Sequence, residues 1–308
     1  MEHEKKLRFR EDGTFKIVQF TDLHWHNGDE KDQSTLQLTE KIIAKEQPDL
    51  VVYTGDVIGS MQSVHPPVSF LQATEAPERL GVPWTVVFGN HDADKKDFDK
   101  EELMEAVLTR QHCFAKAGPS ELHGLGNHAL TVTARDGSAG GALFMLDSGQ
   151  YDGDDYEWIH TDQIQWYVKT SEAMRHRWGR TIPALAFFHI PLPEYDTVWE
   201  TGNCVGRKGE KVCSPKLNSG FFTAMVEQGD VMATFVGHDH VNDYCGEYRR
   251  IRLCYGLKTG YNGYPHNDPA FKRGGRVIVL HENERRFDTW LHHEDHNISQ
   301  VLMTGSNL

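Results

Sequence analysis

Five short motifs place chemically active side chains directly after apolar segments that have the composition of β-strands. The central example is residues 51–54, Val-Val-Tyr-Thr, which lead into Gly55 and Asp56. The same pattern follows the apolar segments 17–20, 86–88, 185–188 and 233–236. The side chains placed after the five segments are Asp22, His24, Asp56, Asn90, His189, His238 and His240. Because the carboxyl ends of parallel strands open at one edge of a sheet, we expect these side chains to converge on Asp56.

A set of seven oxygen and imidazole donors indicates more than one metal ion. A zinc ion takes four ligands, so the set is too large for a single zinc site. Asp56 is the natural bridge between two ions, because a carboxylate has two oxygens and its strand is expected near the centre of the sheet. Asn90 adds a neutral oxygen, which keeps the total ligand charge low. Two bridged ions about 3.5–4 Å apart are an arrangement that enzymes use for in-line displacement at phosphorus.

Each motif also has an ordinary structural explanation. A Gly-Asp pair after a strand is commonly a turn, and Asp-x-His pairs are frequent in loops. A histidine such as His189 is often a hydrogen-bonded core residue, and this chain has 18 histidines. Gly237-His238-Asp239-His240 is the strongest single signal. The metal interpretation is favoured because all five motifs share one structural context and complement one another chemically.

The order and spacing of the motifs resemble those of the calcineurin-like metallophosphoesterase superfamily, over roughly residues 15–280. The matching residues are Asp22-x-His24, Gly55-Asp56, Gly89-Asn90-His91-Asp92, His189 and Gly237-His238-x-His240. Residues 189–195 and 237–246 look like the branch related to purple acid phosphatases. The resemblance implies an α/β fold in which two mixed β-sheets pack face to face with helices on the outside, a four-layer sandwich.

The resemblance also implies a role for each motif residue. The two ligand sets are Asp22, His24, Asp56 and His240 for the first metal, and Asp56, Asn90, His189 and His238 for the second. A metal-bound hydroxide would attack phosphorus. His91 would stabilise the phosphoryl oxygens or protonate the leaving group, and Asp92 would orient the His91 imidazole.

One position departs from the purple acid phosphatase pattern. Those enzymes carry a metal-binding tyrosine three residues after the bridging aspartate, and this chain has Gly59 there. Tyr53 lies on the other side of Asp56 in the sequence. We therefore expect no tyrosinate-to-iron colour. Two divalent ions should bind, and manganese, zinc and iron are all compatible with the donors.

Candidate substrate contacts come from loops near the ligand motifs. Aromatic rings in such loops could stack on an organic leaving group, although each candidate could equally be an ordinary surface or packing residue. The candidates are His26, Asn27, Tyr195, Tyr261 and Tyr264.

The strand and helix patterns around the motifs predict how they are positioned. A strand at 15–21, a helix from Ser34 or Thr35 through Lys45 and the strand before Asp56 form a βαβ unit, which implies a parallel sheet. A turn signal at 135–138 predicts a hairpin and hence a second sheet. We expect strands within 247–255, 276–280 and 286–292 to complete that second sheet. Residues 194–218 lack a core pattern, so we expect a long loop that borders the site as a lid.

Length and charge restrict the domain organisation and the partners. We expect one domain over residues 1–308, with a core at about 15–293 and polar extensions at 1–14 and 294–308. The formal net charge of −13 opposes long nucleic acids, so the expected partner is a small phosphorylated substrate. The sequence lacks an apolar run of about 18 residues and a signal peptide, so we expect no membrane association and a cytoplasmic location.

The five cysteines give a mixed signal. An odd count favours a reducing compartment. Cys245 and Cys254, however, are placed symmetrically about Arg249-Arg250, so a two-residue hairpin would bring them face to face. Arg-Arg is a poor pair for a tight turn, which leaves the disulfide open as the less favoured alternative.

Together these observations predict a metal-dependent phosphoric ester hydrolase that acts on phosphomonoesters or small phosphodiesters. A nuclease or cyclic-nucleotide phosphodiesterase is one alternative, which the acidic charge disfavours. A non-catalytic scaffold with the same fold is another, which the complete donor set and His91 disfavour.

Overall fold

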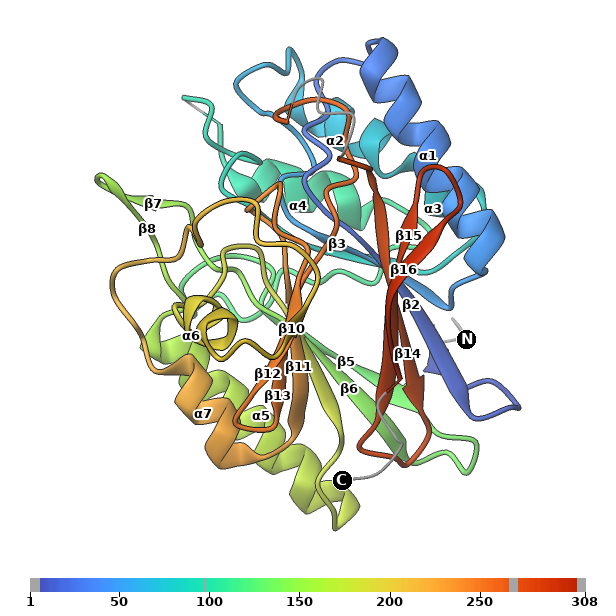
Figure 1. The fold of residues 1–308 in the computed structure, drawn as a ribbon, viewed down its shortest axis with the longest axis vertical. Helices are drawn as coiled ribbons and strands as arrows, with labels where there is room; N and C mark the ends of the chain where they lie inside the picture. The colour runs from blue at the N-terminus through green and yellow to red at the C-terminus, as the bar shows by residue number, and fades with distance from the viewer. Residues whose placement is uncertain (1–5, 97, 266–270, 304–308) are drawn as a thin grey trace.

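The computed structural model describes residues 6–96, 98–265 and 271–303 (Figure 1). Two β-sheets face each other in the middle of the molecule, and helices cover both outer faces. The predicted four-layer sandwich of two mixed sheets is therefore confirmed. The parts of the two terminal extensions at 1–5 and 304–308 lie outside the described residues.

The elements divide between the two sheets and their covering helices. The helices are α1 (Glu30–Glu46), α2 (Pro66–Ala73), α3 (Glu75–Arg79), α4 (Lys100–Leu108), α5 (Thr161–Trp178), α6 (Glu194–Glu200) and α7 (Phe221–Gln228). The eight-stranded sheet has the order β1 (Leu7–Arg8), β5 (His128–Thr133), β6 (Ala139–Met145), β9 (Ala184–Phe187), β11 (Val231–Val236), β13 (Ile251–Tyr255), β12 (Cys245–Tyr248) and β10 (Cys204–Val205). The six-stranded sheet has the order β16 (Ile298–Met303), β15 (Phe287–His293), β14 (Gly274–His281), β2 (Thr14–Phe20), β3 (Leu50–Thr54) and β4 (Trp84–Val87). A separate two-stranded hairpin consists of β7 (Tyr151–Asp152) and β8 (Asp155–Tyr156).

Strand β3 shows why the central strands are apolar throughout. Its side chains alternate between the two faces of the sheet. Leu50 and Val52 pack into the core between the sheets, whereas Val51 and Tyr53 pack in the core on the helix side. All five residues of the strand are buried, so apolar side chains are favoured on both of its faces.

In both sheets, parallel strands lead into the motif loops. Strands β2, β3 and β4 are parallel, as are β6, β9, β11 and β13 in the other sheet. The carbonyl of Val236, at the end of β11, accepts a hydrogen bond from the Gln19 amide of β2. Loops that follow strands of both sheets therefore meet at one end of the sandwich.

Helix α1 begins earlier than its sequence pattern predicted. Asp29 caps it, with a side-chain oxygen that accepts from Asp32 N, and the Asp32 side chain bonds back to complete a capping box. Ser34 and Thr35, the predicted caps, lie inside the helix. Their hydroxyls donate to the carbonyls one turn earlier.

The last strands join a different sheet from the one predicted. Only the hairpin β12–β13 extends the second sheet, whereas β14 pairs with β2 and carries β15 and β16 onto the first sheet. The terminal segments predicted as polar extensions also contribute strands. In β1 Leu7 is buried between the sheets, and β16 pairs with β15. Apolar residues spaced too sparsely to stand out in the sequence fill the edges of the inner core.

The disulfide between Cys245 and Cys254, the less favoured alternative, is present. The two residues are paired across β12 and β13 and are buried in the inner core. Arg249 and Arg250 form the two-residue turn, with φ angles of 51° and 67°. Positive φ at both positions is what a type I′ turn requires, so the hairpin register overrides the poor turn propensity of arginine.

Among the described residues, no helix combines the length and the apolar character needed to cross a membrane.

Candidate metal centre

Four of the predicted donors form one buried group. Asp22 and His24 follow β2, Asp56 follows β3, and His240 follows β11. The Nε2 atoms of His24 and His240 lie 2.9 Å apart. His24 Nε2 is 3.7 Å from an Asp56 oxygen, and His240 Nε2 is 3.5 Å from an Asp22 oxygen. The structure thus brings together the set expected for the first metal.

A second buried group shares Asp56 with the first. His189 Nε2 lies 3.2 Å from an Asp56 oxygen and 3.2 Å from Asn90 Oδ1. The His238 ring is 5.1 Å from the His189 ring, measured between centroids. Asp56, His189 and His238 can together reach one ion, and Asn90 adds its carbonyl oxygen. Asp56 is the residue that the two groups have in common.

The backbone is strained where it presents these donors. Asp22, His24, Asp56 and His238 have φ angles of 53°, 49°, 49° and 76°. Non-glycine residues rarely adopt positive φ, and such strain clusters at functional sites. Each of these residues lies a short distance beyond a strand end, so the strain is located where the donors leave their strands.

Two glycines of the motifs are required by close packing. A Cβ atom on Gly89 would lie 2.2 Å from Asp56 Oδ1. A Cβ atom on Gly237 would lie 2.0 Å from Thr21 Oγ1 and 2.7 Å from Asp22 Oδ2. Any larger residue at either position would displace the carboxylate of Asp56 or Asp22, which belong to the donor groups.

Hydrogen bonds orient the histidines so that Nε2 faces the centre. His189 Nδ1 donates to the carbonyl of Thr54 at 2.8 Å, and His240 Nδ1 donates to the carbonyl of Tyr264 at 2.8 Å. An Nδ1–H that is bound in this way leaves a lone pair on Nε2, as in most metal-binding histidines. His238 Nε2 is buried and, among the described residues, has no hydrogen-bond partner. A buried nitrogen without a partner is costly unless an ion takes that place.

Burial sets the protonation of the imidazoles. It lowers the pKa of His238 to about 3, with help from the neighbouring His189, and it lowers the pKa of His24 and His240 as well. These three imidazoles are therefore neutral, which is the form that binds a metal. His189 differs: burial lowers its pKa, but the Asp56 carboxylate outweighs burial and raises the pKa to about 9. A cation bound at this position would replace that proton.

The two carboxylates of the donor groups, Asp22 and Asp56, remain ionised despite their burial. Burial raises the pKa of Asp22, but the contact with His240 outweighs it and holds the pKa low. For Asp56, the effect of burial on the pKa is outweighed by His189 and His91. Ionised carboxylates, neutral imidazoles and one amide oxygen form a donor set that suits two divalent ions, so the residues present fit the two-metal expectation.

His91 lies beside the two donor groups but belongs to neither. Its backbone N–H donates to Asp56 Oδ1 at 2.8 Å, and its ring is 5.3 Å from that of His24. Its Nδ1 contacts Asp94 Oδ2 at 2.7 Å. Burial lowers the pKa of His91, but Asp56 and Asp94 together raise it to about 9. The imidazole is thus held in its protonated form with Nε2 left over for another partner.

The prediction that Asp92 orients the His91 imidazole was wrong. Asp92 accepts hydrogen bonds from Ile58 N at 2.9 Å and from Gly89 N at 2.7 Å, so its carboxylate holds the backbone of the motif loops. Asp94 orients the imidazole instead, and Ser60 Oγ donates to the other Asp94 oxygen. The sequence offers both aspartates within three residues of His91. The turn at 90–93 directs Asp92 inward, and only the structure shows this.

The five residues predicted to contact the substrate lie in different environments. Tyr264 lies at the site, because its ring stacks on His240 with centroids 4.1 Å apart and its hydroxyl donates to Glu210. The prediction for Tyr195 was wrong: it is a buried core residue of α6 whose hydroxyl contacts Thr234 at 2.8 Å.

The remaining three candidates have structural partners away from the two donor groups. Tyr261 donates to Glu294, and Arg273 lies 4.7 Å above its ring. Asn27 uses both ends of its amide to hold the loop at Gln62 and Val64. The His26 ring lies 3.7 Å from the Asp29 carboxylate. These contacts give each of the three residues a structural role, and contact with a substrate stays a prediction.

Three residues at the site were missed. Tyr151 accepts a hydrogen bond from Asn90 Nδ2 at 2.6 Å, and Tyr156 meets His238 edge-on with centroids 4.4 Å apart. Both belong to the small hairpin β7–β8, around the acidic residues 152–155. Lys258 is buried and donates to the carbonyl of Asp22 at 2.9 Å. The aromatic residues that flank the acidic run were the available signal for the hairpin.

The segment 194–218 is not a structureless loop. It begins with α6, and β10 pairs with β12. Its second half borders the histidine motif: Gly209 N donates to Val241 O at 3.1 Å, and Cys213 N donates to the Asp239 carboxylate at 3.2 Å. The expected position beside the site is thus found for this half. The lid function stays a prediction.

Residues 15–242 match the family model of calcineurin-like phosphoesterases. A protein of Arabidopsis thaliana named probable inactive purple acid phosphatase 14 is 33% identical over 93% of this chain and 80% of its own length. Phosphatase DCR2 of Saccharomyces cerevisiae is 30% identical over 93% of this chain, which spans only 55% of that protein.

Two solved structures share the fold at low sequence identity. A dimetal phosphatase from Danio rerio matches 95% of this chain and 99% of its own, with a TM-score of 0.62 and 14% identity. A purple acid phosphatase from yellow lupin matches 95% of this chain and 53% of its own, with a TM-score of 0.57 and 13% identity. At these identities the likeness shows a common fold.

Proposed function

Because the chain belongs to the calcineurin-like phosphoesterase family, we propose that it is a metal-dependent hydrolase of phosphomonoesters or small phosphodiesters. The observation that carries the proposal is the convergence of two donor groups on one shared carboxylate, Asp56. Two ions that share a carboxylate are suited to displacement at phosphorus. The acidic net charge of −13 supports a small substrate rather than a long nucleic acid.

Each part of the site has a proposed task. Asp22, His24, Asp56 and His240 would hold one divalent ion, and Asp56, Asn90, His189 and His238 the other, with manganese, zinc and iron as candidates. When bound, the ions would act as Lewis acids toward water and the phosphoryl oxygens. His91 would hold a proton for the leaving oxygen while Asp94 keeps its ring in place. The Tyr264 ring, stacked on His240, would form one wall for the substrate.

The names of some relatives favour a second candidate, a non-catalytic protein. Three relatives from Arabidopsis thaliana are named probable inactive purple acid phosphatases, whereas the yeast relative is named a phosphatase. In this chain the two donor groups and His91 are in place. Their presence supports the catalytic proposal, because a scaffold has no need of a protonated histidine beside a metal group.

The test compares metal-free and metal-loaded protein. After chelator treatment, the protein would be assayed with p-nitrophenyl phosphate and bis-p-nitrophenyl phosphate, with manganese, zinc or ferrous iron added. We expect turnover of at least one ester that depends on the metal. In Asp56→Ala the rate should fall by about a hundredfold or more, since metal Lewis acidity contributes several kcal/mol. Asp136→Ala, at an exposed turn, is the matched control and should retain the full rate. Protein that binds two ions yet hydrolyses neither ester would overturn the proposal and favour a non-catalytic role.

A further inference from the structure

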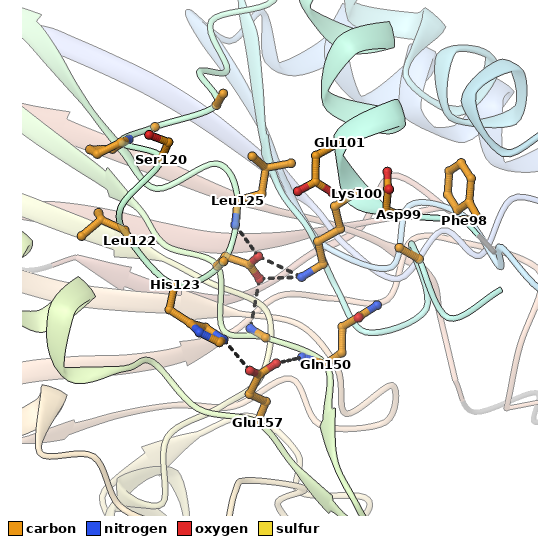
Figure 2. A pocket seen from close by; sticks show the side chains of 17 residues that line it. Phe98, Asp99, Lys100, Glu101, Ser120, Leu122, His123, Leu125, Gln150 and Glu157 are labelled. Atoms are coloured by element: carbon orange, nitrogen blue, oxygen red, sulfur yellow. Dashed lines mark hydrogen bonds and ion pairs between the residues drawn. The ribbon is translucent and has the colours of Figure 1, made fainter. Parts of the chain in front are cut away.

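A second cluster of metal-type side chains lies at the edge of a cavity outside the two donor groups. The cavity has a volume of about 660 Å³ and is bordered by the start of α4, the loop at 117–125 and the segment at 147–157. Figure 2 shows His123 and Glu157 on one side of this cavity, with Lys100 across from them. His160, three residues after Glu157, completes the cluster.

The three side chains are already gathered around one carboxylate oxygen. Glu157 Oε1 lies 2.5 Å from His123 Nε2 and 3.4 Å from His160 Nε2. Each of the three residues offers a donor atom within 4.8 Å of the other two. In a tetrahedral site with metal–ligand bonds of about 2.0–2.1 Å, neighbouring donors are about 3.3 Å apart. Because imidazole lone pairs lie in the ring plane, an ion would be admitted once the stacked His123 and His160 rings tilt apart so that both Nε2 atoms point at it.

The carboxylate is fixed by its other oxygen. Glu157 Oε2 accepts a hydrogen bond from Gln150 N at 2.9 Å, a contact drawn in Figure 2. A Cβ atom on Gly149 would lie 2.4 Å from the same oxygen, so the approach depends on glycine at that position. A ligand held through its non-coordinating oxygen is what a preformed metal site requires.

The His160 imidazole packs against two other rings. It stacks on His123 with centroids 3.6 Å apart and on Trp158 with centroids 4.9 Å apart. Among the described residues, its buried Nε2 has no hydrogen-bond partner. Glu157 Oε1 thus faces the Nε2 atoms of both histidines, and a cation bound among the three side chains would replace these two separate contacts.

We propose that His123, Glu157 and His160 bind a third divalent cation, and that zinc is the ion that suits them. Two imidazoles and one carboxylate are a frequent ligand set for zinc, with water in the fourth position, and the adjoining cavity supplies room for that water. None of the three residues belongs to the groups around Asp56, so the site is separate from the one proposed for catalysis.

A cation at this site would tie the loop at 117–125 to the segment that approaches the other centre. Glu157 holds Gln150 N, and the Gln150 side chain donates to the carbonyl of Asn90 at 3.4 Å. The next residue, Tyr151, accepts from the Asn90 amide. The third ion would thus stabilise the wall of the cavity and, through two residues, the position of Asn90.

The test measures zinc binding in a protein whose catalytic centre has been disabled. Asp56→Ala combined with His240→Ala removes the shared ligand and one further donor. In that background, calorimetric titration with zinc should still show one tight site. Adding His123→Ala and His160→Ala should weaken that site by at least about tenfold, the range found when even outer-shell partners are removed. His176→Ala, an exposed histidine of α5, is the matched control and should leave zinc binding unchanged.

A spectroscopic readout separates the site from activity. In the disabled background, cobalt bound at His123, Glu157 and His160 should give the visible absorption of a four-coordinate ion, and His123→Ala should remove it. Circular dichroism would verify that each variant is folded. Equal zinc affinity with and without the two histidines would overturn the proposal. Because this experiment uses no ester substrate, its outcome is independent of whether the protein proves to be a hydrolase.

Discussion

At the residue scale, the environment of His91 separates the tasks of two nearby aspartates. Asp94 contacts the imidazole, and Asp92 accepts hydrogen bonds from two backbone N–H groups. One carboxylate therefore orients a side chain that faces the site, while the other holds the loops that carry the ligands. Replacement by asparagine should therefore affect turnover at Asp94 and stability at Asp92.

Asp94→Asn should reduce turnover without changing metal content or stability. An amide orients the ring more weakly than a carboxylate and does not stabilise its protonated form, so we expect a loss of about tenfold in kcat with little change in KM. His91→Asn should lose more, in the range of about 10²–10⁴-fold that general acids contribute. The measurements are steady-state kinetics over a range of pH and metal analysis of each variant. A full rate in Asp94→Asn would show that the contact has no positioning role.

Asp92→Asn should reduce stability instead. The amide offers one acceptor oxygen where the carboxylate uses two, so one buried backbone N–H loses its partner, at a cost of about 1–3 kcal/mol. Denaturant unfolding would measure this. Stability equal to that of the wild type would contradict the assignment of Asp92 to the backbone.

At the element scale, a buried polar contact fastens α1 to the six-stranded sheet. Glu46, the last residue of α1, lies 2.6 Å from His292 Nδ1 of β15 and 3.2 Å from Lys16 Nζ of β2. Burial raises the pKa of Glu46, but the hydrogen bond from His292 and the charge of Lys16 outweigh it and lower the pKa below 4.5. The ionised form is thus the one that the folded protein stabilises.

This contact predicts a pH-dependent part of the stability. A carboxyl group whose pKa is lowered by folding contributes stability above its unfolded pKa of 4.5, and that contribution is lost as the pH falls through the folded value. Glu46→Gln should therefore cost about 1–3 kcal/mol at pH 7. The difference from wild type should shrink below pH 4.5. Thermal unfolding of both proteins at pH 7 and at a pH of about 3.5 would check this, and a difference that does not change with pH would contradict it.

The hairpin β12–β13 depends on a turn that its sequence disfavours. Arg249 and Arg250 both have positive φ, and the disulfide between Cys245 and Cys254 closes the hairpin. The double substitution Arg249→Asn and Arg250→Gly creates an Asn-Gly turn. It should stabilise the protein by about 1–2 kcal/mol, because left-handed backbone costs arginine about 1 kcal/mol per residue. The melting temperature would show the gain. A fall in that temperature would mean that the arginine side chains stabilise the hairpin by more than their backbone strain costs.

At the scale of the whole molecule, the two donor groups combine residues from loops of both sheets. Asp22 and Asp56 follow strands of the six-stranded sheet, whereas His189, His238 and His240 follow strands of the other. Ions bound between them would link the two sheets at one end of the sandwich. They would also neutralise part of the net charge of −13, which otherwise opposes compaction.

Removal of metal should therefore lower the stability of the entire domain. A ligand that binds only the folded state adds about 2.7 kcal/mol at a concentration one hundred times its dissociation constant. Chelator-treated protein should melt at a lower temperature than protein with excess manganese or zinc. In Asp56→Ala most of this metal-dependent shift should disappear. An unchanged melting temperature after metal removal would show that the ions do not link the sheets.

The amino-acid sequence was sufficient to predict the central strands, the five motifs at their ends and the seven donors that these motifs carry. The strands and motifs follow from local periodicity, and the rule that parallel strands open at a common edge groups the donors within each sheet. That the two sheets open at the same end of the sandwich was shown only by the tertiary structure. Tertiary contacts were needed to show which sheet received β14 and β15, since several strand pairings satisfy the same apolar pattern. They were also needed to show that Asp94 rather than Asp92 meets His91, because a turn of a few residues directs side chains in ways that spacing does not encode. For the same reason only the structure brought His123 to Glu157, since the two lie in separate loops that meet through packing.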